Sequence, residues 1–194
     1  MPIPPGHYSL GPDEATLTVR TRKAGAASKA GHNLRIEVTS WSATIDVAGA
    51  PEEAAMALTA DPRSLRVREG TGGMQALGDD DKANIEQTID DEVLNGAAIE
   101  FRSRTVRPGA GDALHVEGEL ELAGARHPVA FELTAREDRL SGSARIRQTD
   151  WGIKPYSALF GALKVVDEVD VEIDGRLPAP APAEPGNARR DRRG

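Results

Sequence analysis

The strongest constraint on the fold is the stretch 116–134, VEGELELAGARHPVAFELT, in which apolar and polar residues alternate in two runs across one short break. Alternation with a period of two places the apolar residues of each run on one face of a strand. These residues are Val116, Leu120 and Leu122 in the first run and Val129, Phe131 and Leu133 in the second. The pattern predicts an antiparallel hairpin with one face in water and the other against an apolar space.

The same alternation recurs along most of the chain. It predicts further strands at 7–10, 15–22, 34–38, 41–47, 55–60, 64–67, 97–107, 140–147 and 168–177. Between the third and fourth of these the apolar residues change from even to odd positions, as Ile36 and Ile45 illustrate. A turn or bulge near residues 39–40 is therefore required to keep both apolar sets on the same side.

A register follows for the strand that precedes the hairpin. If residues 109–112 form the loop, the apolar faces of both strands coincide and opposite charges meet on the outer face. The predicted pairs are Phe101 with Leu120, Ile99 with Leu122, Arg102 with Glu119 and Arg104 with Glu117.

One α-helix is predicted from the acidic triplet 79–81 to about residue 94. Its apolar stripe recurs every four residues and consists of Ile85, Ile89 and Val93. The aspartates supply an N-cap and favourable charge at the positive end of the helix, and Asn95-Gly96 predicts its end. A second, short helix is predicted after Pro155, because Leu159 and Leu163 lie one turn apart.

Strand segments with mostly short connections, some of them continuing one another across a turn, predict a mainly β fold, an antiparallel eight-stranded β-barrel with one or two short helices. A two-sheet sandwich has the same sequence signature. Aromatic residues make up only 4% of the chain, which favours an interior that side chains do not fill. The domain boundaries predicted are a loose segment at 1–12, the barrel at 13–177 and a disordered Pro/Ala/Arg tail at 178–194.

Composition excludes several classes of function. The chain of 194 residues has a formal charge of −7 and no cysteine, which argues against a dedicated nucleic-acid binder and excludes disulfides and thiolate chemistry. No stretch has the length of a membrane span, and the start lacks the features of a signal peptide. A cytoplasmic protein is the expectation from these observations.

Catalytic and metal-binding patterns are not found either. The four histidines occur singly, without the spacing of a metal site, and no nucleophile elbow or phosphate loop is present. His32 stands out because it opens a strand beside the flexible segment 23–31, where a barrel has its mouth and a ligand headgroup would lie. We therefore predict no catalytic residue, no metal and no cofactor. An enzyme that uses His32 ranks third, after the two binding hypotheses given below.

The order of features resembles the YceI-like family, whose members resemble lipocalins and bind polyisoprenoid or other long apolar lipids. Four stretches carry the resemblance: AGHNL at 30–34, ALTADPRSLRV at 57–67, EGELELAGARHPVAFEL at 117–133 and QTDWGI at 148–153. The chain departs from the family pattern at 90–98, DDEVLNGAA, where an aromatic phrase is usual. Many relatives are exported, whereas this start carries no signal peptide.

The leading hypothesis is therefore non-catalytic binding, storage or transport of a long isoprenoid or fatty chain in a lipocalin-like barrel. The alternative is a protein-interaction or stress-response module with a filled barrel; a homodimer remains open in either case. The predicted ligand-binding residues are Leu17, Val19, His32, Leu34, Ile36, Ile99, Phe101, Leu120, Leu122, Phe131, Leu133, Trp151 and Phe160.

Overall fold

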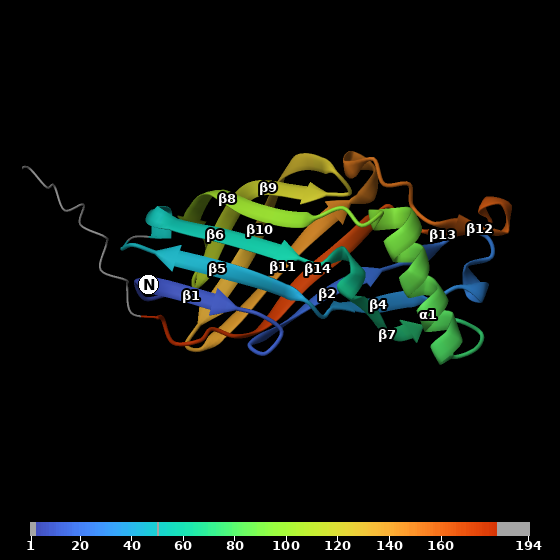
Figure 1. The fold of residues 1–194 in the computed structure, drawn as a ribbon, viewed down its shortest axis with the longest axis horizontal. Helices are drawn as coiled ribbons and strands as arrows, with labels where there is room; N and C mark the ends of the chain where they lie inside the picture. Colours follow the sequence, from blue (N-terminus) through green and yellow to red (C-terminus); the bar gives the residue numbers. More distant parts are fainter. Residues whose placement is uncertain (1–2, 50, 182–194) are drawn as a thin grey trace, which may run out of the picture.

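The structure, a computed structural model, describes residues 3–49 and 51–181 and is dominated by antiparallel strands (Figure 1). The strands are β1 (Gly6–Leu10), β2 (Ala15–Thr21), β3 (Lys23–Ala24), β4 (Asn33–Val38), β5 (Trp41–Val47), β6 (Ala54–Ala60), β7 (Leu65–Thr71), β8 (Ile99–Pro108), β9 (Ala113–Leu122), β10 (Ala125–Arg136), β11 (Arg139–Arg147), β12 (Ser157–Ala158), β13 (Leu163–Val165) and β14 (Glu168–Arg176). Helix α1 (Asp79–Thr88) continues into a π-helical turn, Ile89–Leu94. Short 3₁₀ turns occupy Ser28–Ala30, Pro51–Glu53, Pro62–Ser64, Gln148–Trp151 and Leu159–Gly161.

Eleven strands form one curled sheet in the order β1-β5-β6-β8-β9-β10-β11-β14-β2-β4-β7. Three pairs of successive strands, β1 with β2, β4 with β5 and β6 with β7, are each joined by a short kink. The bent pairs stay side by side across their kinks. β5 pairs with β1 on one side and with β6 on the other, and β4 pairs with β2 on one side and with β7 on the other. With each pair counted as one bent strand, the ring contains eight strands and closes through β14 and β2. The predicted barrel is confirmed, and the sandwich is wrong.

The kinks lie where the parity of the apolar residues changes. The Thr39 N–H donates to the Ser64 carbonyl at 2.9 Å, and the Asp61 N–H donates to the Ser40 carbonyl at 2.9 Å. These bonds tie the kink between β4 and β5 to the one between β6 and β7. The turn predicted near residues 39–40 is thus confirmed, and it lets both strands change direction without exposing their apolar faces.

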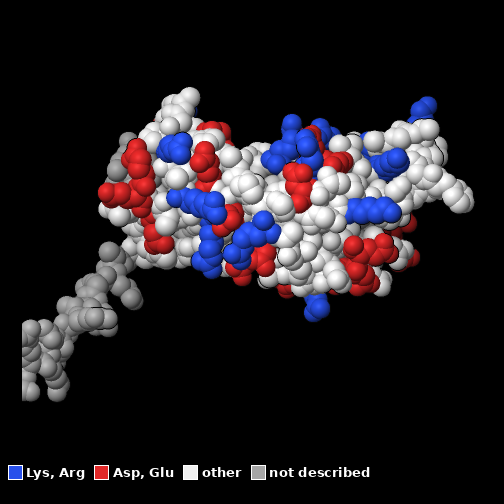
Figure 2. Space-filling model, turned by 90° about the horizontal axis from the view of Figure 1, so that it is seen from above, with Lys and Arg blue, Asp and Glu red and all other residues white. Residues whose placement is uncertain are grey.

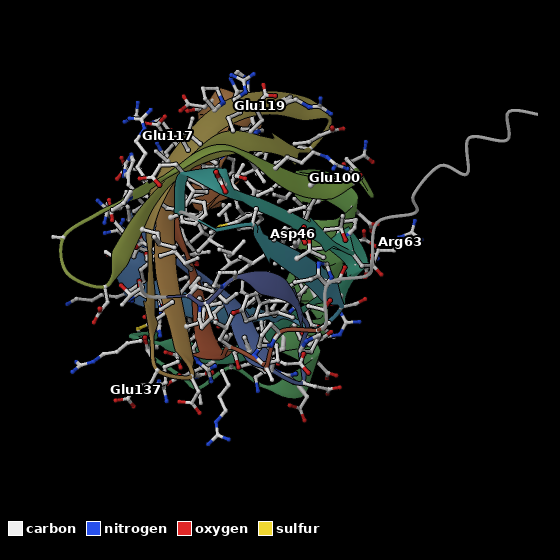
Figure 3. All side chains as sticks on the ribbon, turned by 90° about the vertical axis from the view of Figure 1, so that its left-hand side faces the viewer. Asp46, Arg63, Glu100, Glu117, Glu119 and Glu137 are labelled. Atoms are coloured by element: carbon white, nitrogen blue, oxygen red, sulfur yellow. The ribbon has the colours of Figure 1, made fainter. Side chains whose placement is uncertain are left out.

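The predicted hairpin is β9–β10, and Glu117 and Glu119 of β9 point outward from the ring (Figure 3). The pairs Phe101 with Leu120 and Arg102 with Glu119 are confirmed, and Glu100 opposite Glu121 continues the register that places Ile99 opposite Leu122. The pair of Arg104 with Glu117 is wrong. A bulge between Ser103 and Thr105 places Thr105 opposite Glu117, and Arg104 instead forms an ion pair with Glu119 at 2.8 Å.

Neither the bulge nor the tight hairpin turn has a sequence signature. Ser103 accepts the Met56 N–H through its hydroxyl at 2.8 Å, a contact with β6 that a local pattern does not show. The turn between β9 and β10 consists of Ala123 and Gly124, with φ of 50° and 79°. Hairpins of this kind need two positive φ values, which Ala rarely supplies, so the sequence does not mark the turn at these two residues.

Helix α1 covers the edge of β7. The Val67 N–H on that edge donates to the Glu86 side chain at 2.8 Å, so the edge does not remain free for another strand. The helix begins after Gly78, whose N–H donates to the Asp81 carboxylate at 3.1 Å, so the aspartate acts from within the first turn and not as the N-cap. Its predicted end is confirmed, with Asn95 in the left-handed conformation at φ 50°.

The termini and the segment after Pro155 differ from expectation. Ile3 is buried and the Tyr8 hydroxyl donates to the Pro4 carbonyl at 2.6 Å, so residues 3–12 belong to the barrel and are not loose. Residues 178–181 run beside β1, where the Ala181 N–H donates to the His7 carbonyl at 2.8 Å. The rest of the predicted tail, 182–194, lies outside the described residues. The short helix predicted after residue 155 is wrong, because the segment forms β12, a 3₁₀ turn and β13.

The interior is filled at the end of the barrel that holds β1 and the loops after β8 and β10 (Figure 1). Tyr8, Val106, Val116 and Leu140 are its most deeply buried large side chains. Together they form a dry plug at this end, and the functional question concerns the other end.

Candidate functional site

An apolar cavity of about 570 Å³ occupies the other part of the barrel. The inner faces of β2, β4, β8–β11 and β14 form its wall, and α1 lies along one side of it. Its volume lies within the range of roughly 300–1,000 Å³ that is typical of small-molecule sites. The low aromatic content explains the space, since few large side chains are available to fill a barrel of eight strands.

The structure brings together eleven of the thirteen residues predicted to bind ligand. They line the cavity and comprise Leu17, Val19, His32, Leu34, Ile36, Ile99, Phe101, Leu120, Leu122, Phe131 and Leu133. Several of the apolar ones remain only half-buried although they point inward, as an unfilled interior requires. Phe101 and Phe131 contact each other across β8 and β10, with ring centroids 5.4 Å apart. That these residues contact a ligand stays a prediction.

Trp151 and Phe160 do not line the cavity. Trp151 is buried in a separate cluster with Ile146 and Ile153, where its indole N–H donates to the Leu120 carbonyl at 3.0 Å. This bond fixes Trp151 to β9. Phe160 is fully exposed on the turn between β12 and β13. The sequence groups these aromatics by proximity along the chain, but the 3₁₀ turn at Gln148–Trp151 and the strand β12 send them in different directions.

Sequence reasoning missed part of the wall. The stripe on α1 and its continuation, Ile85, Ile89 and Val93, lines the cavity, although its period suggested only a helix packed on the core. The kinked strands add Ala43, Met56 and Leu58, and β10 and β14 add Val129, Val171 and Ile173. Their alternation was visible in the sequence, but which half of each strand faces the cavity depends on where the plug ends.

The mouth of the cavity lies beside a small three-stranded sheet, β12-β13-β3. Lys23 and Lys164, from β3 and β13, line the rim. The Lys23 ammonium donates to the Gly31 carbonyl at 2.9 Å and also contacts the Gly72 carbonyl. These bonds hold the loop after β7 against the segment before β4 and so define the rim.

His32 lies on this rim, with its Nε2 2.7 Å from the Gln75 carbonyl oxygen. The loop after β7 packs so closely on the ring that a side chain at Gly73 would collide with it. The imidazole is thus held as part of the mouth. In the described part of the chain, no carboxylate bonds the imidazole to orient it as a general base.

Several polar residues also line the cavity, and Gln148 and Thr21 are two of them. Gln148 is buried, and its amide donates to the Val166 and Asp167 carbonyls at 3.1 and 3.2 Å, so its polarity is satisfied by the backbone. The Thr21 hydroxyl, at the end of β2 next to the mouth, is buried without a hydrogen-bond partner in the described part of the chain. An unpaired hydroxyl on a cavity wall offers a hydrogen bond to a bound molecule.

Metal chemistry finds no support in residues 3–49 and 51–181, where no group of three His, Asp or Glu side chains is placed to hold an ion. Within the same residues, no helix combines the length and the apolar character needed to cross a membrane. The geometry offers an apolar container with a polar rim.

A closed antiparallel barrel with such a container defines the class of ligand-binding β-barrels. Within this class the YceI-like domain family matches residues 8–177, and the chain belongs to that family. Membership supports lipid binding at the level of the family, which generally comprises binding proteins and not enzymes. Comparison with curated protein sequences gives no match.

Solved structures share the fold. The crystal structure of BcnA from Burkholderia cenocepacia is 15% identical, with a TM-score of 0.63 over 84% of this chain and 96% of BcnA. Two mutants of the CJ YceI protein, one of them with a monobromobimane guest, are each 12% identical, with a TM-score of 0.54 over 73% of this chain and 82% of theirs. At these identities the likeness concerns the fold alone.

Proposed function

We propose that this protein binds a long apolar chain, isoprenoid or fatty, inside the barrel and carries or stores it without chemical change. The observation that supports the proposal is the cavity of about 570 Å³ with its apolar wall and its single polar rim. A hollow of this kind loses the packing that a filled core would gain, so the sequence maintains the hollow at a cost in stability.

The energetics favour a long chain over a short one. Each methylene transferred from water into the cavity contributes about 0.8 kcal/mol, so ten contribute about 8 kcal/mol. Association itself costs roughly 4–15 kcal/mol. A chain of only a few carbons is therefore bound weakly, whereas a chain that runs along the wall from the mouth to the plug offsets a substantial part of this cost.

The polarity of the rim orients the ligand. The unpaired Thr21 hydroxyl and the ammonium groups of Lys23 and Lys164 lie at the mouth, while the wall behind them is apolar. A ligand with one polar end, such as a hydroxyl, carboxylate or phosphate, is expected to bind with that end at the mouth. Replacing Thr21 by Val keeps the shape and removes the hydrogen bond, so it should weaken a chain with a polar end more than a pure hydrocarbon.

The other two hypotheses fit the site less well. A side-chain-filled barrel disagrees with the volume of the cavity. An enzyme based on His32 fits less well because, within residues 3–49 and 51–181, the ring bonds a backbone carbonyl and no carboxylate that would activate it.

Native mass spectrometry of the full chain after gentle purification tests the proposal, combined with titration of the delipidated protein with a prenol and with a long fatty acid. A co-purified mass or saturable one-to-one binding of either chain is expected. The proposal is overturned if no additional mass co-purifies with the protein and neither probe binds to it. A short-chain acid with the same headgroup is the matched control and should bind far more weakly.

A further inference from the structure

The turn between β12 and β13 presents large apolar side chains to solvent. Leu159 is 57% exposed and Phe160 is fully exposed, whereas Leu163 on the following strand packs against Gly31. The name "tip" is used here for Leu159 and Phe160. In Figure 1, β12 and β13 stand at the end of the molecule opposite β1. Exposed neighbouring side chains of this size mark a site of interaction.

The backbone of the tip is held in an unfavourable conformation. Leu159 and Phe160 adopt positive φ values of 51° and 54°, and Gly161 follows at 87°. Residues with a Cβ rarely occupy this region, and two large ones in succession gain nothing there for the packing of the barrel. Such an outlier is evidence for a requirement other than folding.

The surroundings of the tip are basic in an acidic chain. The segments 22–31 and 151–166 contain no Asp or Glu, although the chain carries a net charge of −7. Pairing of β3 with β13 places the two segments side by side, and the Ala27 N–H donates to the Ala162 carbonyl between them. In Figure 2 this end of the molecule shows white and blue atoms at its extremity. The basic residues of the two segments are Arg22, Lys23, Lys29, Lys154 and Lys164. Arg22 forms an ion pair with Asp170 at 3.8 Å and the Lys23 ammonium bonds two backbone carbonyls, so Lys29, Lys154 and Lys164 are the cations that would meet headgroups.

We propose that the tip docks on an anionic lipid bilayer, with Leu159 and Phe160 inserted at the interface and the basic residues around them against lipid headgroups. Apolar anchors beside a cluster of cations are the combination that binds anionic membranes, since each supplies an attraction that alone is weak. Helix α1, at the same end, begins with three aspartates. The tip, and not the whole end face, is therefore the part that meets the bilayer.

Docking in this orientation turns the cavity mouth toward the membrane. Tyr156 and Lys164, which flank the tip in sequence, both line the cavity. An apolar chain that leaves the bilayer beside the tip reaches the wall without crossing bulk water. Only this use for ligand exchange depends on the proposed function; the docking itself does not.

The test is co-flotation of the full chain with vesicles of phosphatidylcholine alone and of phosphatidylcholine with phosphatidylglycerol, at low and high salt. Binding to the anionic vesicles, weakened by salt, is expected. Phe160→Asn should weaken it by about tenfold or more, since it removes the larger anchor. Because Asn tolerates positive φ, this variant should fold at least as well as the parent protein.

A matched pair of charge reversals makes the test specific. Lys154→Glu should weaken flotation, whereas Arg136→Glu near the plug should not. No flotation, or flotation equally sensitive to the tip and control variants, would overturn the proposal. So would a native mass measurement in which Phe160→Asn separates a dimer, because the tip would then serve a second copy of the chain.

The result is independent of the test of the cavity. A protein that floats with vesicles and binds no prenol or fatty acid retains the docking and loses the proposed function. A protein that binds these chains without floating retains the function and loses the docking.

Discussion

A larger side chain placed on the cavity wall distinguishes a hollow interior from a packed one by its effect on stability. Ala144 lies on β11, opposite Val171 of β14, and lines the cavity. In a packed core, Ala144→Phe would cost about 1–3 kcal/mol through overpacking. In the cavity, the ring finds space, so we expect the free energy of unfolding to stay within about 0.5 kcal/mol of the parent value or to rise, since added apolar surface is buried.

The same ring removes room for a ligand. It occupies the place of about six methylenes, and at roughly 0.8 kcal/mol each the lost binding energy is up to about 5 kcal/mol. A flexible chain recovers part of this by bending elsewhere. We therefore expect the dissociation constant for a long fatty acid or prenol to rise by at least about tenfold, which corresponds to about 1.4 kcal/mol.

Two variants with the same substitution provide matched controls. Ala135, 1% exposed, lies in the plug, where Phe should cost the full price of overpacking, about 1–3 kcal/mol. Ala130 lies on the outer face of β10 opposite Glu117, where Phe should change neither stability nor binding. Urea unfolding measures the first quantity, and titration with a fluorescent fatty acid measures the second.

Two results would refute the reasoning. If Ala144→Phe destabilises the protein as much as Ala135→Phe, then the space in the wall is not available in solution. If Ala144→Phe is stable and binds the chain as well as the parent protein does, then the ligand does not occupy this cavity.

Three further predictions concern the framework. Glu132 raises the pKa of His115 through a hydrogen bond. The protonated ring should therefore stabilise the fold at pH values below 6.5, the ordinary pKa, and this effect should be lost as pH rises through the folded-state pKa. In urea unfolding, the stability difference between the parent protein and His115→Gln should vanish at high pH, and a constant difference would contradict the assignment. Gly118→Ala should lower the free energy of unfolding by about 1–3 kcal/mol because its Cβ would collide with the Arg102 carbonyl and the Phe101 ring, and an unchanged urea midpoint would argue against the close approach of β8 and β9. Trp151→Phe should cost about 1–3 kcal/mol, since it leaves the buried Leu120 carbonyl that the indole satisfies without its partner; thermal unfolding measures this, and an equal melting temperature would contradict it.

The strands and the barrel could be predicted because each depends on a local pattern. One apolar face per strand is written into alternate residues, and the change of parity near Thr39 forces a kink whatever the rest of the chain does. The register around Phe101 and Leu120 followed for the same reason, since a shift by one residue would turn every apolar side chain outward.

What failed depends on contacts between distant segments. The bulge at Ser103 is stabilised by the Met56 N–H from a neighbouring strand, and no property of the Ser-Arg-Thr triplet announces it. Trp151 and Phe160 are close in sequence, but Trp151 is buried in a core cluster, whereas Phe160 is exposed on the 3₁₀ turn that follows β12. The boundary between plug and cavity is likewise a property of all the strands together.

The plug described above also acts as a depth stop. Leu10, Met56 and Leu133 line the cavity and are buried members of the core cluster that includes the plug, so they mark where a chain that enters at the mouth meets packed side chains. The longest chain that fits is then set by a few side chains at this boundary, and not by the number or length of the strands. Enlarging or trimming these residues moves the stop along an unchanged barrel, so that proteins with one fold acquire different limits on the length of what they carry.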